Sequence, residues 1–96
     1  MAGYVIADVD VHDPEGYEEY RRLVPATLER YGGRFLIRGG KTEQLEGDWQ
    51  PKRLVVLEFP SAEQARRWWE SEEYREAKEL RQRLATSSLL LVEGVS

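Results

Sequence analysis

The sequence predicts an α+β fold: one four-stranded antiparallel sheet with helices on one face, in the ferredoxin-like order β-α-β-β-α-β. Two observations lead to this class. Short segments rich in β-branched and aliphatic residues, suited to half-buried strands, occur at four places. Apolar residues at helical spacing fill the stretch between the first and second segments, and the stretch between the third and fourth. The 96 residues fit one domain, spanning 1–96.

The first strand and the first helix have clear signals. Apolar and polar residues alternate over 4–11, as in a strand with one buried face. Asp13 followed by Pro14 is typical of a helix N-terminus, and Gly32-Gly33 of a helix end. The buried stripe of this helix is expected to consist of Tyr17, Tyr20, Val24, Leu28 and Tyr31.

The second strand is predicted over 34–38. Gly39-Gly40 interrupts it with a kink, and the strand is expected to resume over 42–45. A turn over 47–51 leads into the third strand, predicted over 53–59.

The second helical region has two predicted caps. Ser61-Ala62-Glu63-Gln64 matches a capping box, and Ser71 followed by two glutamates indicates a second helix start. Trp68 and Trp69 are adjacent on a helix, so at least one is expected in the core and the other at an interface. The fourth strand is predicted over 88–93.

Strand alternation assigns side chains to the two faces of the sheet. The helix-covered face is predicted to carry Val5, Ala7, Val9, Val11, Phe35, Ile37, Val55, Leu57, Phe59, Leu90 and Val92. The open face is predicted to carry Ile6, Asp8, Asp10, Leu36, Arg38, Leu54, Val56, Glu58, Leu89, Leu91 and Glu93. Leaving its six aliphatic side chains in water forfeits on the order of 10 kcal/mol, so a second copy is expected to cover this face in a homodimer.

Arg38 is the main binding candidate. Beside Gly39-Gly40 it could present a guanidinium to a carboxylate or enolate of a ligand. Alternatively it forms a structural salt bridge with Asp8, Asp10 or Glu58, which share its predicted face. These carboxylates would then be partly buried with shifted pKa values, as in acid–base sites.

Three further residues have two interpretations each. Glu58 could act as a general base or serve as the structural partner of Arg38. His12, the single histidine, could carry a proton or be an exposed loop residue. Trp49 could cap a pocket of the partner copy or cover the local turn.

Composition excludes several functions. One histidine and no cysteine make a transition-metal or haem site improbable, and no cofactor is expected. A net charge of −4 without a basic stripe argues against nucleic acid. An RNA-recognition module, which has the same element order, would need aromatic residues on the open face of strand three, where Leu54, Val56 and Glu58 are expected. The start of the sequence shows no signal peptide, and no segment is long enough to span a membrane, so a cytoplasmic protein is expected.

Several motifs together resemble the domain-of-unknown-function 1330 family, over nearly the whole chain. They include Tyr31-Gly-Gly-Arg-Phe-Leu, Arg38-Gly-Gly, Glu46-Gly-Asp-Trp49, Leu57-Glu-Phe-Pro-Ser61 and Ser71-Glu-Glu-Tyr74. The resemblance implies membership of the dimeric α+β barrel superfamily and a homodimer whose two sheets form a barrel. It implies no particular activity, because other branches of the superfamily include cofactor-free monooxygenases, muconolactone isomerases and haem degraders.

Two functions follow as hypotheses. The first is a cofactor-free enzyme acting on a small organic acid or enone-like molecule. Arg38, Trp49, Asp8 and Asp10 would contact the substrate, and His12 or Glu58 would move a proton. The second is a non-catalytic small-ligand binding or dimerisation module in which the same charges are structural.

Overall fold

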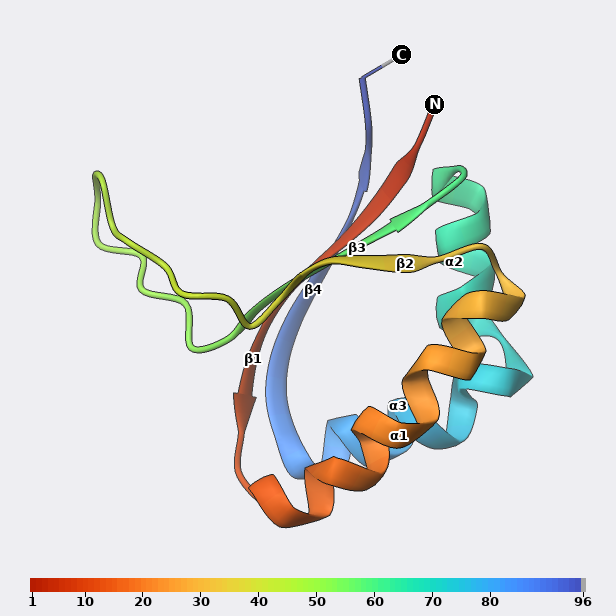
Figure 1. Ribbon diagram of the computed structural model, residues 1–96, viewed down its shortest axis with the longest axis horizontal. Helices are drawn as coiled ribbons and strands as arrows, with labels where there is room; N and C mark the ends of the chain where they lie inside the picture. Colours follow the sequence, from red (N-terminus) through yellow and green to blue (C-terminus); the bar gives the residue numbers. More distant parts are fainter. Residues whose placement is uncertain (96) are drawn as a thin grey trace.

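The computed structural model describes residues 1–95 and contains one antiparallel sheet covered on one face by three helices (Figure 1). The strands follow the order β2-β3-β1-β4, so β2 and β4 form the edges. The strands are β1 (Gly3–Val11), β2 (Arg34–Arg38), β3 (Leu54–Phe59) and β4 (Ala85–Glu93). The helices are α1 (Pro14–Arg30), α2 (Ala62–Glu70) and α3 (Glu72–Leu84). The predicted fold class is confirmed.

All three predicted helix caps are present. The Asp13 carboxylate accepts a hydrogen bond from the Gly16 amide at 3.1 Å, at the start of α1. The Ser61 hydroxyl accepts from the Gln64 amide at 3.0 Å, at the start of α2. Ser71 ends α2 and begins α3: its hydroxyl donates to the Trp68 carbonyl at 2.7 Å and accepts from the Tyr74 amide at 3.1 Å. A two-piece helical region therefore forms as expected, because a single serine serves both helix ends.

The core lies between the sheet and the helices. Val5, Ala7 and Val9 of β1 are buried in it, as the alternation predicts. Trp68 stacks on Tyr74 with ring centroids 4.0 Å apart and donates its indole N–H to the Thr27 hydroxyl. Trp69 is 39% exposed, so one of the two tryptophans lies in the core as predicted, while an interface at Trp69 stays a prediction.

The predicted face of Arg38 and Ile37 is wrong. Phe35 pairs with Leu57 and Ile37 with Val56, so Leu36 is an extra residue in β2 and forms a β-bulge. An extra residue reverses the alternation beyond it. Ile37 therefore lies on the open face, and Arg38 lies on the helix-covered face, where its guanidinium sits 4.2 Å above the Phe35 ring.

The predicted faces of the β4 residues are also reversed. Ala7 pairs with Leu89 and Val5 with Leu91, which places these two leucines on the helix-covered face. Leu90 and Val92 occupy the open face instead, since they pair with Ile6 and Tyr4. The strand also starts three residues earlier than predicted, at Ala85.

Residues 39–53 form a long loop that extends away from the sheet, which we call the arm (Figure 1). The strand predicted over 42–45 is absent there. The side chain of Gln44 donates to the Gly47 carbonyl, and Gln50 donates to Gln44 at 3.1 Å. These hydrogen bonds within the arm stabilise its conformation near the tip.

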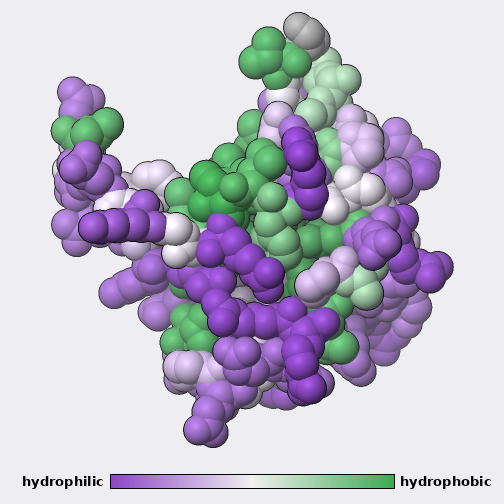
Figure 2. Space-filling model, viewed as in Figure 1, coloured by the Kyte–Doolittle hydropathy of each residue, from purple (hydrophilic) through white to green (hydrophobic). Residues whose placement is uncertain are grey.

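The open face of the sheet carries a continuous apolar patch. Figure 2 shows this hydrophobic surface between the arm and the terminal strands. Its aliphatic members belong to all four strands and include Leu90, which is 64% exposed. They are Ile6, Leu36, Ile37, Leu54, Val56, Leu90 and Val92.

Candidate functional site

Two neighbouring cavities lie between the sheet and α1. The inner cavity, about 50 Å³, is lined by residues of all four strands, α1 and α3. The outer cavity, about 450 Å³, lies between α1, the end of β1 and the base of the arm. Val9, Tyr17, Arg21 and Arg53 line both, so the two spaces adjoin.

Four arginines line the inner cavity: Arg21, Arg38, Arg53 and Arg81. Arg21 pairs with Glu18, one turn before it on α1, at 3.3 Å. Within residues 1–95, no aspartate or glutamate forms an ion pair with the other three arginines. The cavity therefore has an excess of positive charge, in a chain whose net charge is −4.

Arg81 is the most unusual of these arginines because it is only 5% exposed. Its Nε donates to the Tyr74 hydroxyl at 3.3 Å, and that hydroxyl lies 2.8 Å from the hydroxyl of Tyr20. Since Tyr74 accepts from Arg81, it can donate its own proton to Tyr20. Tyr20, which lines the cavity, can then offer its proton to a ligand.

The ionisation states in the cavity suit anion binding. Burial raises the pKa of Tyr17 and, far more strongly, that of Tyr20, so both hydroxyls stay protonated at neutral pH. Burial and the neighbouring Arg21 and Arg38 lower the pKa of Arg53, which still remains protonated because arginine starts so high. Burial lowers the pKa of Arg81, whereas the adjacent Tyr74 and Tyr20 oxygens raise it. The rise outweighs the fall, so the pKa of Arg81 is higher than its ordinary value.

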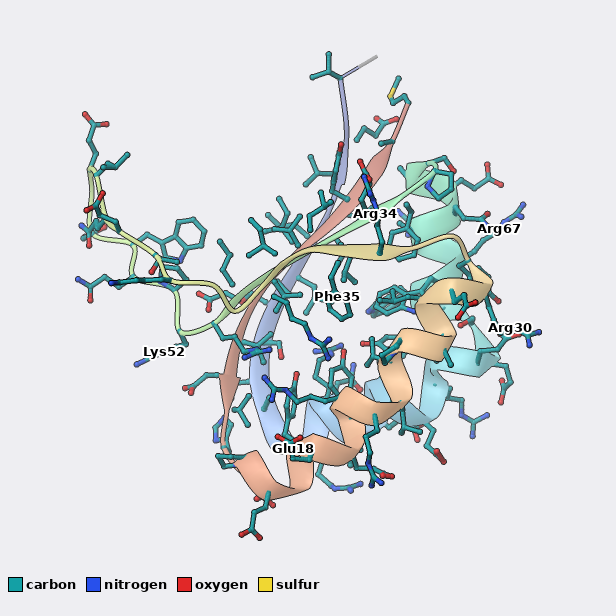
Figure 3. The ribbon with its side chains drawn as sticks, viewed as in Figure 1. Glu18, Arg30, Arg34, Phe35, Lys52 and Arg67 are labelled. Carbon is teal, nitrogen blue, oxygen red and sulfur yellow. The ribbon has the colours of Figure 1, made fainter. Side chains whose placement is uncertain are left out.

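Arg38 therefore lines the candidate site, but from the helix-covered face of the sheet and not from the predicted open face. The β-bulge at Leu36 turns it into the inner cavity, beside Arg53 and against Phe35. Figure 3 shows Phe35 on the helix side of β2 and Arg34 on the opposite side. Arg38 is not paired with Asp8, Asp10 or Glu58.

Asp8 and Trp49 meet at the base of the arm. One Asp8 oxygen accepts from the backbone amide of Lys52 at 2.9 Å, and the other lies 3.4 Å from the Trp49 indole nitrogen, which donates to it. The Asp8 carboxylate thus fastens the arm to β1. Trp49 remains 62% exposed on the arm and lines neither of the two cavities.

Glu58 lies on the open face, in a separate cluster. Arg34 donates to it at 2.7 Å through Nε, and the Tyr4 hydroxyl donates at 3.2 Å. These hydrogen bonds, chiefly the one from Arg34, lower the pKa of Glu58 below its ordinary value, although partial burial opposes them. The structural partner of Glu58 is therefore Arg34, not Arg38.

His12 and Asp10 lie at the other end of β1. The His12 Nε2 is 2.7 Å from the Thr86 hydroxyl, and Asp10 lines the outer cavity. Glu58 neighbours Tyr4 while His12 follows the last residue of β1, so they are roughly 26 Å apart at the usual rise per strand residue. The six predicted site residues therefore fall into separate places, and His12 and Glu58 of one chain lie too far apart to act on one small molecule together.

The sequence analysis missed Arg53 and Arg81 and treated Tyr17 and Tyr20 only as packing residues. A signal for Arg81 was present, because it falls at helical spacing on the apolar stripe formed by Tyr74, Ala77 and Leu84. A charged residue on a buried stripe indicates a buried charge that needs a partner.

No group of three or more histidines, cysteines, aspartates or glutamates comes together in the described residues 1–95. Among the same residues, no helix combines the length and apolar character needed to cross a membrane.

Several solved structures share this fold at low sequence identity. A protein of unknown function from Rhodopseudomonas palustris, RPA0582, superposes with a TM-score of 0.76 and 23% identity, covering 99% of this chain and 83% of that one. SnoaB, a cofactor-independent oxygenase from Streptomyces nogalater, gives a TM-score of 0.62 and 17% identity, covering 99% and 93%. Rv0793 from Mycobacterium tuberculosis gives 0.57 and 17%, covering 100% and 97%.

No curated protein matches the sequence. A family model does match, over residues 2–95, which is nearly the full length of the chain. Together with the shared fold, this match confirms the resemblance seen in the motifs: the chain belongs to the family described as Domain of unknown function (DUF1330).

Proposed function

We propose that this protein binds a small organic anion, a carboxylate or an enolate, in the inner cavity and acts on it without a cofactor. The observation behind the proposal is Arg81, which is buried to 5% exposure without a carboxylate partner among the described residues. A buried charge without a partner costs several kcal/mol, and folding alone gains nothing from it. A negatively charged ligand beside Arg81 would supply the missing partner.

The residues around the cavity have complementary roles in this proposal. Arg38 and Arg53 would hold the negative group of the ligand through charge-assisted hydrogen bonds. Tyr20, with its proton directed by Tyr74, would donate to an enolate or carboxylate oxygen. Fixed donors in a cavity stabilise a developing negative charge better than water does.

The proposal of cofactor-free chemistry is supported by analogy only. SnoaB, which shares the fold, is named a cofactor-independent oxygenase. An arginine-rich cavity would favour the enolate of an enolisable substrate over its neutral form. The enolate is already activated, so no redox cofactor is needed to activate it. Fold similarity alone does not transfer an activity, so the cavity residues are the main support.

A second candidate function is binding without catalysis. Among the described residues, no aspartate, glutamate or histidine lines the inner cavity, so it contains no evident general base. Glu18 lies only at the outer cavity and pairs with Arg21. Proton transfer by His12 or Glu58 stays a prediction, to be tested by His12→Gln and Glu58→Gln separately, as they lie far apart.

We also propose that two copies pack through their open faces as a homodimer. The apolar patch of this face, with Leu90 largely exposed, is the support. Burying one aliphatic side chain yields roughly 1.5–3 kcal/mol, so seven on each copy would offset the cost of association. The arms would then flank the partner, where Trp49 could contact it.

The cytoplasmic location expected from the sequence also stays a prediction.

Calorimetric titration with acetoacetate, a small enolisable carboxylate, tests the binding proposal. We expect measurable binding that weakens at least tenfold in Arg53→Gln and is unchanged in Arg83→Gln, an exposed arginine on α3. Equal binding by all three proteins would contradict the site, and no binding of any small acid would contradict the function. An oxygen electrode and NMR of the mixture then separate the candidates: conversion indicates an enzyme, and binding without conversion indicates a binding protein.

A further inference from the structure

The positive charges of the site fall into two groups. Arg21 and Arg53 line both cavities, whereas Arg38 lines only the inner one. Arg81 lines the inner cavity but not the outer one, and it comes from α3 rather than from α1 or the base of the arm. Tyr17 lines both cavities, next to both groups.

From this arrangement we infer that the ligand is a dianion with its two negative groups apart, one in the inner cavity beside Arg81 and Arg38 and the other beside Arg53, towards the outer cavity. The inference rests on the proposed function and specifies its substrate class. With Arg21 paired to Glu18, three guanidinium groups remain to be balanced. A ligand with one negative group would balance only one of these three positive charges.

The remaining charged and titratable groups do not change this balance. Asp10, Glu18 and Lys52 line only the outer cavity, and Asp10 is exposed to solvent. Tyr17 and Tyr20 are neutral because their pKa values are raised. The inner end at Arg81 therefore has no negative neighbour among the described residues.

The size of the cavities limits the shape of this dianion. About 50 Å³ accepts a few water molecules or one carboxylate group, whereas an aromatic ring needs a space of roughly 150 Å³. The end of the ligand that reaches Arg81 is therefore small. The larger remainder, up to the second negative group, fits the outer cavity of about 450 Å³. A linear dicarboxylate has this form.

Calorimetric titration at one fixed salt concentration tests the inference. The probes are malonate, succinate, glutarate and adipate, with butyrate as the monocarboxylate matched in length to succinate, and inorganic phosphate as a dianion with its charge in one place. We expect the best dicarboxylate to bind at least tenfold more tightly than butyrate and than phosphate. In Arg81→Gln this ratio should fall to within twofold, and in the matched control Arg83→Gln it should persist.

Each other outcome contradicts a defined part of the proposal. If butyrate binds as tightly as the dicarboxylates, or if phosphate equals them, the two-ended dianion is wrong although an anion site remains. If none of these acids binds, the proposed function fails as well. Should Arg81→Gln not fold by circular dichroism, the ratio in the unsubstituted protein decides, together with Arg81→Lys, which keeps the charge and should keep the ratio above tenfold.

Discussion

Arg53 occupies the space that a side chain at Gly39 would need. A Cβ placed on Gly39 would lie 2.7 Å from a terminal nitrogen of Arg53 and 2.9 Å from its Cζ. Gly39 also has a φ of +71°, a backbone conformation that residues with a Cβ rarely adopt. Gly39 therefore allows the turn after β2 and leaves room for the Arg53 side chain at the cavity.

Gly39→Ala should weaken stability and anion binding together. The positive φ costs roughly 1–2 kcal/mol for alanine, and the new methyl group displaces Arg53. Urea denaturation and titration with acetoacetate measure the two effects. Gly40→Ala is the matched control, because nothing lies within 4 Å of a Cβ at that neighbouring position. Equal losses in the two variants would show that Arg53 does not depend on Gly39.

Arg81→Met should not destabilise the folded protein, although Arg81 is buried. The substitution removes a buried charge without a carboxylate partner and fills the space with an apolar chain of similar length. Thermal unfolding should give an equal or higher Tm, while anion binding is lost, as expected for a residue kept for function. Tyr74→Phe should instead lower stability by about 1–3 kcal/mol, since it leaves Arg81 and Tyr20 without their shared hydroxyl. A large fall in Tm for Arg81→Met would show that Arg81 is structural.

Val56→Asp should separate the proposed dimer. Val56 lies at the centre of the open face, opposite Ile6 on β1 and Ile37 on β2, so an aspartate there would be buried without a partner between two sheets. Light scattering should report twice the chain mass for the unsubstituted protein and one chain mass for the variant. Gln82→Asp, on the exposed surface of α3, should keep the larger mass. A monomeric unsubstituted protein would refute the proposed interface.

The stabilising contribution of Glu58 should be lost in acid. Arg34 and Tyr4 lower its pKa in the folded state below the unfolded value of about 4.5. The carboxylate therefore stabilises the fold above that pH, and the contribution disappears as the pH falls through the lower folded pKa. Tm measured between pH 7 and pH 3 should drop less in Glu58→Gln than in the unsubstituted protein, so the two curves should converge at low pH. Parallel curves would mean that the ion pair with Arg34 is too exposed to matter.

Ser71→Ala should cost more than Ser61→Ala. The Ser71 hydroxyl completes two helix ends, whereas that of Ser61 completes one. An N-cap serine contributes about 1 kcal/mol, and Ser71 is also buried, so its loss leaves the Trp68 carbonyl without this donor. Urea denaturation of the two variants measures the difference, and a larger loss for Ser61→Ala would contradict this account of the α2–α3 junction.

Most of the fold was predictable because its signals are local. Alternation in β1 and the serines at 61 and 71 depend on neighbouring residues alone. The faces of β4 were not predictable, because Leu89-Leu90-Leu91-Val92 is apolar at every position and either face could be buried. Only the pairing of Leu89 with Ala7, a contact distant in sequence, decides between them.

The site was predictable only in part. Arg38 was found through its neighbouring glycines, although on the wrong face, since nothing in Arg34–Arg38 reveals an unpaired residue opposite Val56. Arg53 lies at the edge of a strand, and its position has no sequence signature of its own. Arg81 had a signal, its place on the apolar stripe of α3, but that stripe does not show which residues it meets. The two arginines meet because β3 lies in the sheet while α3 packs against α1 and β4, which is a property of the three-dimensional arrangement.

The extra residue at Leu36 means that the number of residues in β2, rather than their identity, decides what Arg38 contacts. A family member lacking that single residue could keep the same arginine and glycines, yet would direct the arginine to the opposite surface. When such sequences are aligned, a one-residue gap between Phe35 and Gly39 should therefore be treated as the loss of a site residue. A conserved arginine letter in that column would not by itself show a conserved site.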